Sequence, residues 1–283
     1  MRRAVLWFAC AVACAGPTTG CALFTASETA TPTEWLRPTL PPLRSAADAV
    51  QLQVVFVERP ADDPAMQQLV WQEVDQVGAT PPAVRSVLAD NGLRVAQCGS
   101  NLPPTLQNLL GLSAEGPAAR PADHSTTRSH QLSLPSGQDS EVLVNGPLEH
   151  CRVRFVLNGQ QEILEFEQTR CVLRIKPIRL QDGWVKLEIA PEIHHGESRL
   201  RHASTAEGWA FRPGQLTEVR HALKFQLTLN TGELALVGAG DGPTDTVGQR
   251  FFRHDQDGQA RQRLLVIRVV HAGREPSDDP RQP

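Results

Sequence analysis

Hydrophobic and polar residues alternate over most of the second half of the chain. In the segment CRVRFVL, at 151–157, Cys151, Val153 and Phe155 fall on one side of an extended strand, and the arginines between them fall on the other. The pair Asn158-Gly159 that follows is a strong signal for a tight hairpin. Comparable runs lie at 162–167, 171–180, 183–193, 222–230, 232–238 and 263–270, with turns at Asp182-Gly183 and Thr231-Gly232. The pattern predicts at least seven strands in a half-buried antiparallel sheet or sandwich.

The first half of the chain combines strand and helix periods. A β-branched run at 50–60 predicts a strand, and apolar residues at helical spacing predict a helix over 63–77 with Asp63 as its N-cap. Further helices are expected at 81–92, closing on Asn91 and Gly92, and at 103–111, with a short strand at 93–99 between them. We therefore expect a small α/β domain whose helices cover one face of a small sheet.

These patterns predict an α+β chain with two domains. The α/β domain spans 48–112 and the larger β-domain spans 129–272. The segment 113–128 lacks large apolar residues and is interpreted as a linker, and 273–283 as a disordered tail.

The first residues have the three parts of an export signal. Arg2 and Arg3 precede an apolar core that is too short to span a bilayer, and small residues follow. The segment TTGC at 18–21 resembles the lipobox of bacterial lipoproteins, which implies lipidation of Cys21 after removal of 1–20. Cleavage by ordinary signal peptidase after Ala15 and an uncleaved signal remain alternatives. With a Thr/Pro/Ala-rich tether over 21–47, we expect a lipid-anchored protein of the cell envelope, at the outer membrane and facing the periplasm.

The net charge limits the class of binding partner, and the cysteine content limits the possible disulfides. The chain has a formal charge of −3, and the mature chain has −5 because 1–20 carries only Arg2 and Arg3, so nothing favours nucleic acid as a partner. After lipidation three thiols remain, and an oxidising envelope can pair two of them within one chain. Cys151 and Cys171 lie on the apolar faces of their strands, which suits either a disulfide or two buried thiols. If a disulfide forms, we expect it to join these two and to leave out Cys98.

Three segments between 172 and 270 resemble the C-terminal β-domain of secretins, the outer-membrane ring proteins of type II and III secretion and type IV pilus systems. VKLEIAPEI at 185–193 is similar to a family strand that ends in Pro-Glu. TGELALVGA at 231–239 matches a family turn and strand at Gly232, Leu234 and Gly238. VGQRFF at 247–252, followed by RLLVIRVV, matches a further segment and the final strand at Val247, Gly248 and Phe251. The resemblance implies a secretin-like sheet or sandwich and a place in an envelope assembly.

The chain also departs from that family. The family's repeated N-terminal domains do not fit into 48–112, and the region between PEIHHGE and VRHALKFQL is short and polar where secretins have membrane-inserting strands. We therefore expect the protein not to form a pore by itself, although self-association remains possible.

No segment carries a complete catalytic or ligand-binding motif. In EIHHGE, strand alternation sends Glu192 and His194 to one face and His195 to the other, so no three ligands converge locally and no metal is expected. The glycine-rich segment VGAGDGP is not followed by a helix, so it does not form a phosphate-binding turn. The segment DQDGQ lacks the later ligands of a calcium loop, and the sequence has no Gly-x-Ser-x-Gly nucleophile elbow. We expect no cofactor and no catalytic residue.

The sequence thus favours a non-enzymatic binding or scaffolding protein with unidentified protein partners. The alternative is an envelope hydrolase or carbohydrate-active protein whose groups converge only in three dimensions.

Overall fold

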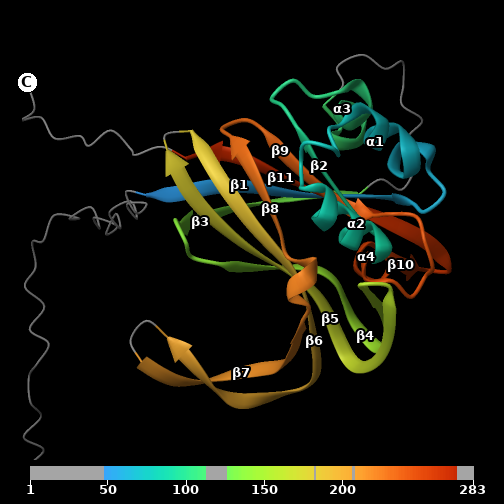
Figure 1. The fold of residues 1–283 in the computed structure, drawn as a ribbon, viewed down its shortest axis with the longest axis vertical. Coiled ribbons are helices and arrows are strands. Elements are labelled where there is room, and N and C mark those ends of the chain that lie inside the picture. The colour runs from blue at the N-terminus through green and yellow to red at the C-terminus, as the bar shows by residue number, and fades with distance from the viewer. Residues whose placement is uncertain (1–47, 113–125, 182, 206–207, 273–283) are drawn as a thin grey trace, which may run out of the picture. The chain divides into compact units, whose positions relative to one another are not determined.

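The computed structural model describes residues 48–112, 126–181, 183–205 and 208–272. This part of the chain is an α+β fold dominated by antiparallel strands, which confirms the predicted fold class (Figure 1). The expected signal with Cys21, the tether, most of the linker and the tail lie outside the described residues. None of the described helices is both long and apolar enough to span a membrane.

The first sheet, sheet A, joins strands from both ends of the chain. Its strand order is β2-β9-β11-β1-β3, and β10 pairs with β11 as a short hairpin. The strands are β1 (Ala49–Pro60), β2 (Leu93–Cys98), β3 (Thr126–Pro135), β9 (Leu234–Ala239), β10 (Arg253–Gln256) and β11 (Gln259–His271). All pairs between them are antiparallel.

The second sheet, sheet B, is a meander of long strands in the order β4-β5-β6-β7, and β8 also pairs with β6. Its strands are β4 (Ser140–Leu157), β5 (Gln160–Gln181), β6 (Trp184–Thr205), β7 (Gly208–Val219) and β8 (Phe225–Asn230), with the 3₁₀ turn η2 (His221–Leu223) between β7 and β8. The predicted turn between β4 and β5 is present, with φ of 52° at Asn158 and 77° at Gly159. The extension of β6 and the whole of β7 are absent from the sequence prediction, because the end of β6 is polar and Pro213-Gly214 interrupts the short apolar alternation of β7.

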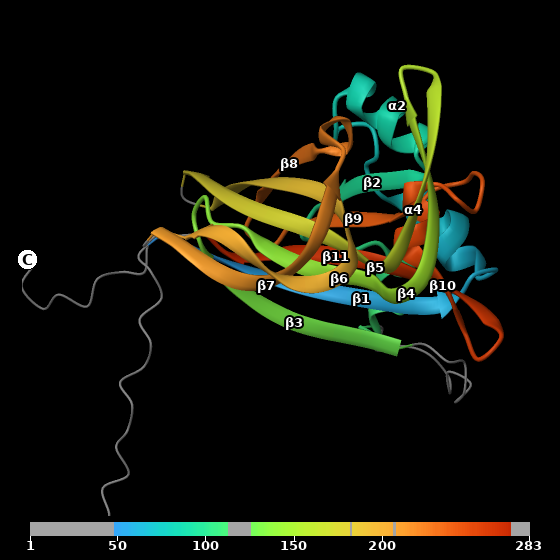
Figure 2. The same ribbon diagram turned by 90° about the horizontal axis from the view of Figure 1, so that it is seen from below.

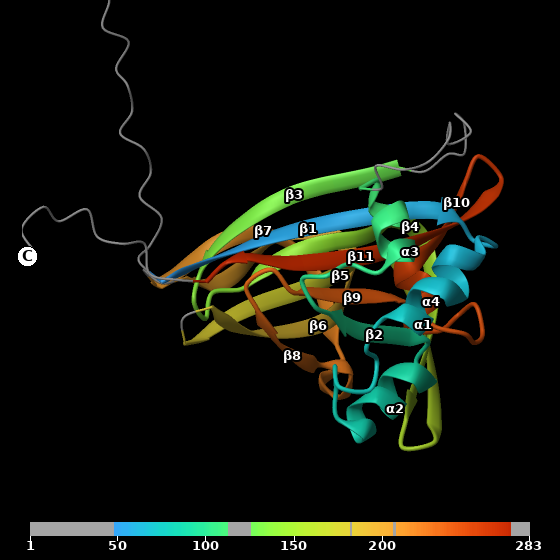
Figure 3. The same cartoon turned by 90° about the horizontal axis from the view of Figure 1, so that it is seen from above.

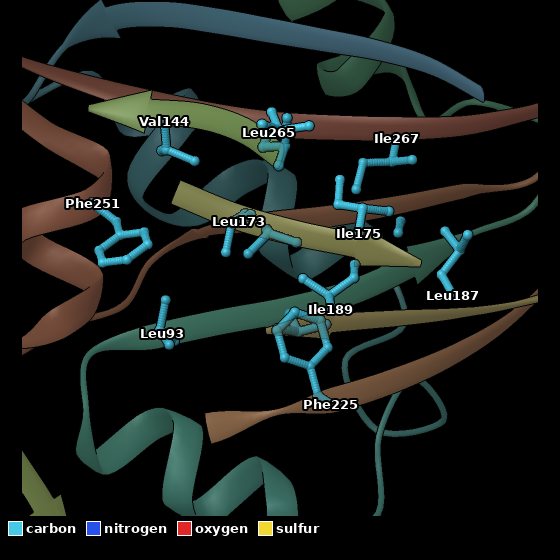
Figure 4. Close-up of a cluster of buried hydrophobic side chains, with 14 of the residues drawn as sticks. Leu93, Val144, Leu173, Ile175, Leu187, Ile189, Phe225, Phe251, Leu265 and Ile267 are labelled. Carbon is cyan, nitrogen blue, oxygen red and sulfur yellow. The ribbon is translucent and has the colours of Figure 1, made fainter. Parts of the chain in front are cut away.

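The two sheets pack face to face as a sandwich. Alternate residues of each sheet point inward, so that Leu265 and Ile267 of sheet A meet Leu173 and Ile175 of sheet B (Figure 4). Phe225 and Phe251 close this core from β8 and from the helix α4 (Val247–Phe252). Burial of apolar surface between the sheets is the main source of stability, at about 25 cal/mol per Å².

A second apolar core lies on the outer face of sheet A. It is covered by a π-helical turn, η1 (Ala65–Leu69), by α1 (Val70–Glu73) and by α3 (Pro104–Leu110), as seen in Figure 3. The central strands β9 and β11 of sheet A are therefore largely buried on both faces. The fully buried β9, LALVGA, has a continuous apolar run for this reason.

The first helix differs from its prediction. It ends at Glu73, and the π-helical turn shifts its phase so that Trp71 faces the sheet, whereas Leu69 and Val77 are exposed. Asp63 caps the turn as expected, because its carboxylate accepts a hydrogen bond of 2.8 Å from the Ala65 N–H. The helix α2 (Pro82–Asp90) and α3 lie where the sequence placed them.

The segments predicted as two domains share one sheet, which corrects the expected division. From 48–112, β1 lies between β11 and β3, and β2 pairs with β9. Residues 45–283 accordingly form one compact unit. The sequence pattern could not reveal this because strand pairing between segments about 200 residues apart leaves no local signal.

The turn at Thr231-Gly232 is also not a hairpin. It carries the chain from β8 in sheet B to β9 in sheet A, and the two strands belong to different layers. The half-buried pattern of β8 and the fully buried pattern of β9 reflect these different positions.

The β4–β5 hairpin bends sharply near Gly146. The strand register shifts between Leu143 and Leu148, and Gly146 has a φ of 117°. A Cβ atom there would lie 2.8 Å from the Thr169 carbonyl oxygen, so only glycine fits this close approach. Figure 2 shows the distal half of the hairpin turning away from the rest of sheet B, toward α2 and α4.

Asn91, fully buried at the end of α2, ties that hairpin to α2 and α4. Its Nδ2 donates to the carbonyl oxygens of Val87 (2.8 Å) and Val156 (2.7 Å), and its Oδ1 accepts from the Val156 N–H (2.9 Å). Its own carbonyl oxygen accepts from the Gly248 N–H at 2.9 Å. We call this set of contacts the Asn91 junction; it joins α2, β4 and α4.

We predict that Asn91→Ala lowers the free energy of unfolding by about 2–4 kcal/mol, because the buried peptide groups of Val156 lose their partners. Chemical denaturation measures the change. Asn91→Asp loses both donated hydrogen bonds and places a buried carboxylate beside the carbonyl oxygens of Val87 and Val156, so it should cost at least as much. Asn101→Ala, at an exposed position, should be near neutral. Equal effects at Asn91 and Asn101 would contradict the structure.

Candidate functional site

The segment EIHHGE lies on β6, and its side chains divide between the two faces as predicted. Glu192 and His194 are buried on the outer face of sheet B, where His194 Nε2 lies 3.1 Å from Glu192 Oε2. His195 points to the other face, where its ring centroid is 4.7 Å from that of Phe166. Glu197 is exposed and forms an ion pair with Arg199.

Arg174 of β5 is the centre of an ion-pair network on this face. Its guanidinium donates two hydrogen bonds to Glu192, of 2.6 and 2.9 Å, and others to Glu141 (3.0 Å) and Asp139. These partners come from three segments: β6, β4 and the turn before β4. The sequence did not indicate this network, because its members lie up to 53 residues apart, at Asp139 and Glu192.

The network determines the charge state of Glu192. Burial by itself raises the pKa of this carboxyl, but hydrogen bonds from His194 and Arg174 and the charge of Arg174 outweigh burial and lower the pKa to about 2. The pKa of Arg174 is raised, chiefly by its hydrogen bonds to Glu192. Glu192 and Arg174 are therefore both charged at neutral pH.

Glu141, Glu192 and His194 offer three ligand atoms within 4.8 Å of one another, which local alternation on one strand could not reveal. Both carboxylates already accept hydrogen bonds from Arg174. A metal ion would have to displace this cation. The ion pairs of Arg174 hold β4, β5 and β6 in register. A hollow of about 320 Å³ lies beside them.

A second charged cluster surrounds Glu58 of β1. Its carboxylate accepts a hydrogen bond of 2.9 Å from Arg263 Nε and lies 3.2 Å from His254 Nε2 and 3.7 Å from Arg261 Nε. Burial raises the pKa of Glu58, but the hydrogen bond and charge of Arg263, with the other cations, lower it overall. Burial and the neighbouring arginines, Arg263 first, lower the pKa of His254 despite the opposing effect of Glu58. A hollow of about 270 Å³ opens beside Glu58 and Arg263.

The three cysteines in the described part of the chain, Cys98, Cys151 and Cys171, are buried and free. Cys151 and Cys171 are in hydrogen-bond contact with each other, which raises the pKa of Cys171, with burial as a further cause. The bend in the β4–β5 hairpin brings them together, although Cys151 pairs across the strands with Phe166. Cys98 lies in the other core, on the far face of sheet A, where burial raises its pKa.

The six secretin-matching residues lie in the core or at positions where the backbone favours glycine. Leu234, Val247 and Phe251 are core residues. Gly232 has a φ of 91°, a Cβ at Gly238 would lie 2.9 Å from the Trp71 ring, and a Cβ at Gly248 would lie 1.6 Å from the Gly92 carbonyl oxygen. The motifs thus mark the places where chain segments pack most closely.

No protein-family model matches the sequence, and no curated protein matches it significantly. Among solved structures, the type II secretin GspD from enteropathogenic Escherichia coli is similar, with 15% identity, a TM-score of 0.24, and 78% of this chain and 68% of that chain covered. A chain of the ETEC pilotin–secretin AspS–GspD complex matches with 14% identity, a TM-score of 0.23 and coverages of 78% and 49%. A chain of the Klebsiella pneumoniae type II secretion system outer membrane complex (PulD, PulS and the PulC HR domain) matches with 15% identity, a TM-score of 0.23 and coverages of 78% and 40%. The similarity to secretins is thus weak and at the level of the fold.

We predict that the Arg174 network makes stability depend on acid pH. Because the pKa of Glu192 is lowered from 4.5 to about 2 on folding, its stabilisation is fully present above pH 4.5 and is lost as the pH falls toward 2. Glu192→Gln should remove about 2–3 kcal/mol at pH 7 and flatten the decline in unfolding free energy below pH 4.5. Denaturation at several pH values measures this. Glu197→Gln, at an exposed ion pair, should leave the profile unchanged.

We also predict that any disulfide within the chain joins Cys151 to Cys171, because their thiols touch while sheet A separates both from Cys98. Peptide mapping without reduction tests this on protein from its native compartment. A linkage from Cys98 to either of the other two would show the prediction to be wrong.

Proposed function

We propose that the protein is a lipid-anchored component of the cell envelope whose secretin-like β-domain binds or scaffolds other proteins, in an assembly of the secretion or pilus type. The secretin-like part rests on the motifs of 185–270, and the location rests on the signal and Cys21. The binding role rests on the open edges of both sheets.

The open edges are the observation that carries the binding role. Among the described residues, β3 pairs only with β1, and β7 pairs only with β6. An edge strand presents N–H and C=O groups that another chain can use. Large apolar side chains are exposed near these edges, at Leu143 on β4 and at Leu216 on β7.

The enzymatic alternative requires catalytic groups that converge. Carboxylate–histidine pairs do converge in the described residues, at Glu192 with His194 and at Glu58 with His254. In both pairs an arginine forms an ion pair with the carboxylate. This supports a non-catalytic role.

Photo-cross-linking in native membranes tests the binding role. A photoreactive residue in place of Thr127 on β3, or of Thr217 on β7, should give specific adducts, whereas one in place of Gln72 on the helical face should not. Adducts would identify the partners by mass spectrometry. The absence of adducts from both edges would contradict the proposal.

We predict that Cys21→Ser moves the protein from the membrane to the soluble fraction or leaves it unprocessed. Several acyl chains on one residue anchor a protein firmly, and a serine at this position would carry none of them. Membrane fractionation and intact-mass measurement check this. A lipid-free wild-type N-terminus at Gly16 would show that ordinary signal cleavage occurs instead.

A further inference from the structure

The sandwich is open on the side where β3 and β4 lie. These strands follow each other in the chain, and each ends its own sheet. Thr126–Gln131 are exposed on both faces of β3. Figures 2 and 3 show β3 along the outside of sheet A. The unpaired side of β3 is thus accessible to a further strand.

The hollow beside this edge, of about 270 Å³, lies between β3, β1 and β4. Phe56, Leu143 and Val144 supply apolar surface, and Arg128, His130 and Arg263 supply nitrogen donors. The His130 ring stacks on Phe56, with ring centroids 6.2 Å apart. This contact orients an exposed histidine over the hollow.

The charge of this hollow is unbalanced. Its carboxylate, Glu58, is already engaged by Arg263, Arg261 and His254. Arg128 has no ion-pair partner among the described residues. Two guanidinium groups, Arg128 and Arg263, thus line the hollow with one carboxylate, which leaves one positive charge in excess and favours an anionic occupant.

The spacing of the cations matches a strand. Arg128 and His130 both line the hollow and are two residues apart, which puts them on one face of β3 at about 7 Å separation. An added strand has the same repeat, so that acidic side chains at positions i and i+2 would face these two residues.

We propose that β3 binds an extended acidic segment of a partner protein by strand addition, with acidic residues at alternate positions above Arg128 and His130. This inference rests on the proposed binding role and specifies its partner class. The backbone of β3 provides the affinity, and the hollow provides the selectivity for acidic side chains.

The test uses the mature full-length chain and three labelled ten-residue peptides of alternating Val and Glu, Val and Gln, or Val and Lys. Fluorescence anisotropy should show the Glu peptide binding about 3–10-fold more tightly than the Gln peptide, because exposed ion pairs contribute only modestly to binding free energy. The Lys peptide should bind most weakly. Added salt should reduce the difference.

Arg128→Glu should reverse the preference between the Glu and Lys peptides. Arg128 is exposed, so the variant should fold, which circular dichroism and thermal denaturation verify. Arg152→Glu is the matched control, an exposed arginine on the distal half of β4, and should not change the preference. Hydrogen exchange should show protection of the β3 amides on addition of the Glu peptide.

Equal affinities for the three peptides would overturn the proposal. So would full competition by free glutamate or phosphate, because either would show a simple anion site without strand addition. Protection at β7 in place of β3 would refute the acidic site at β3 and leave the general binding role intact. The general role fails separately, if neither edge gives cross-links in native membranes.

Discussion

The Asn91 junction is the contact on which the arrangement of the layers depends. One buried amide side chain substitutes for a strand partner at Val156 and at the same time closes α2. The adjacent Gly92 carbonyl accepts a hydrogen bond from the Gly240 N–H at 2.7 Å, and the backbone of Gly248 packs against it. Because buried peptide groups must be paired, the bent hairpin, α2 and α4 have a single mutual position that satisfies all of them.

This position accounts for the two different cores. Sheet A lies between sheet B and the helices, so β9 and β11 are apolar on both faces, whereas sheet B has one face on the core and one on solvent. The solvent face of sheet B can therefore carry the Arg174 network. The charged residues stabilise strand register there, and the apolar residues stabilise the layers.

The side between β3 and β4 is the part of the sandwich that this packing leaves open. The helical elements η1, α1 and α3 cover the outer face of sheet A, α4 packs into the core between the sheets, and the Glu58 cluster lies beside the hollow at the open side. The binding role that we propose uses this open side of the sandwich. In the same proposal, the cations at the open side select among extended chains by charge.

The sequence by itself determined the local structure: the strand at 151–157, the Asn158-Gly159 turn, α2 and α3, and the division of Glu192 and His195 between faces. Each of these follows from a period of two or 3.6 residues or from a turn residue, which are properties of neighbouring positions. Only the tertiary structure decided that 48–112 and 129–272 share sheet A, that the turn at Gly232 changes sheets, and that Glu141 and Arg174 join Glu192. These depend on pairing between distant segments, whose free energy is gained only when the whole sandwich closes.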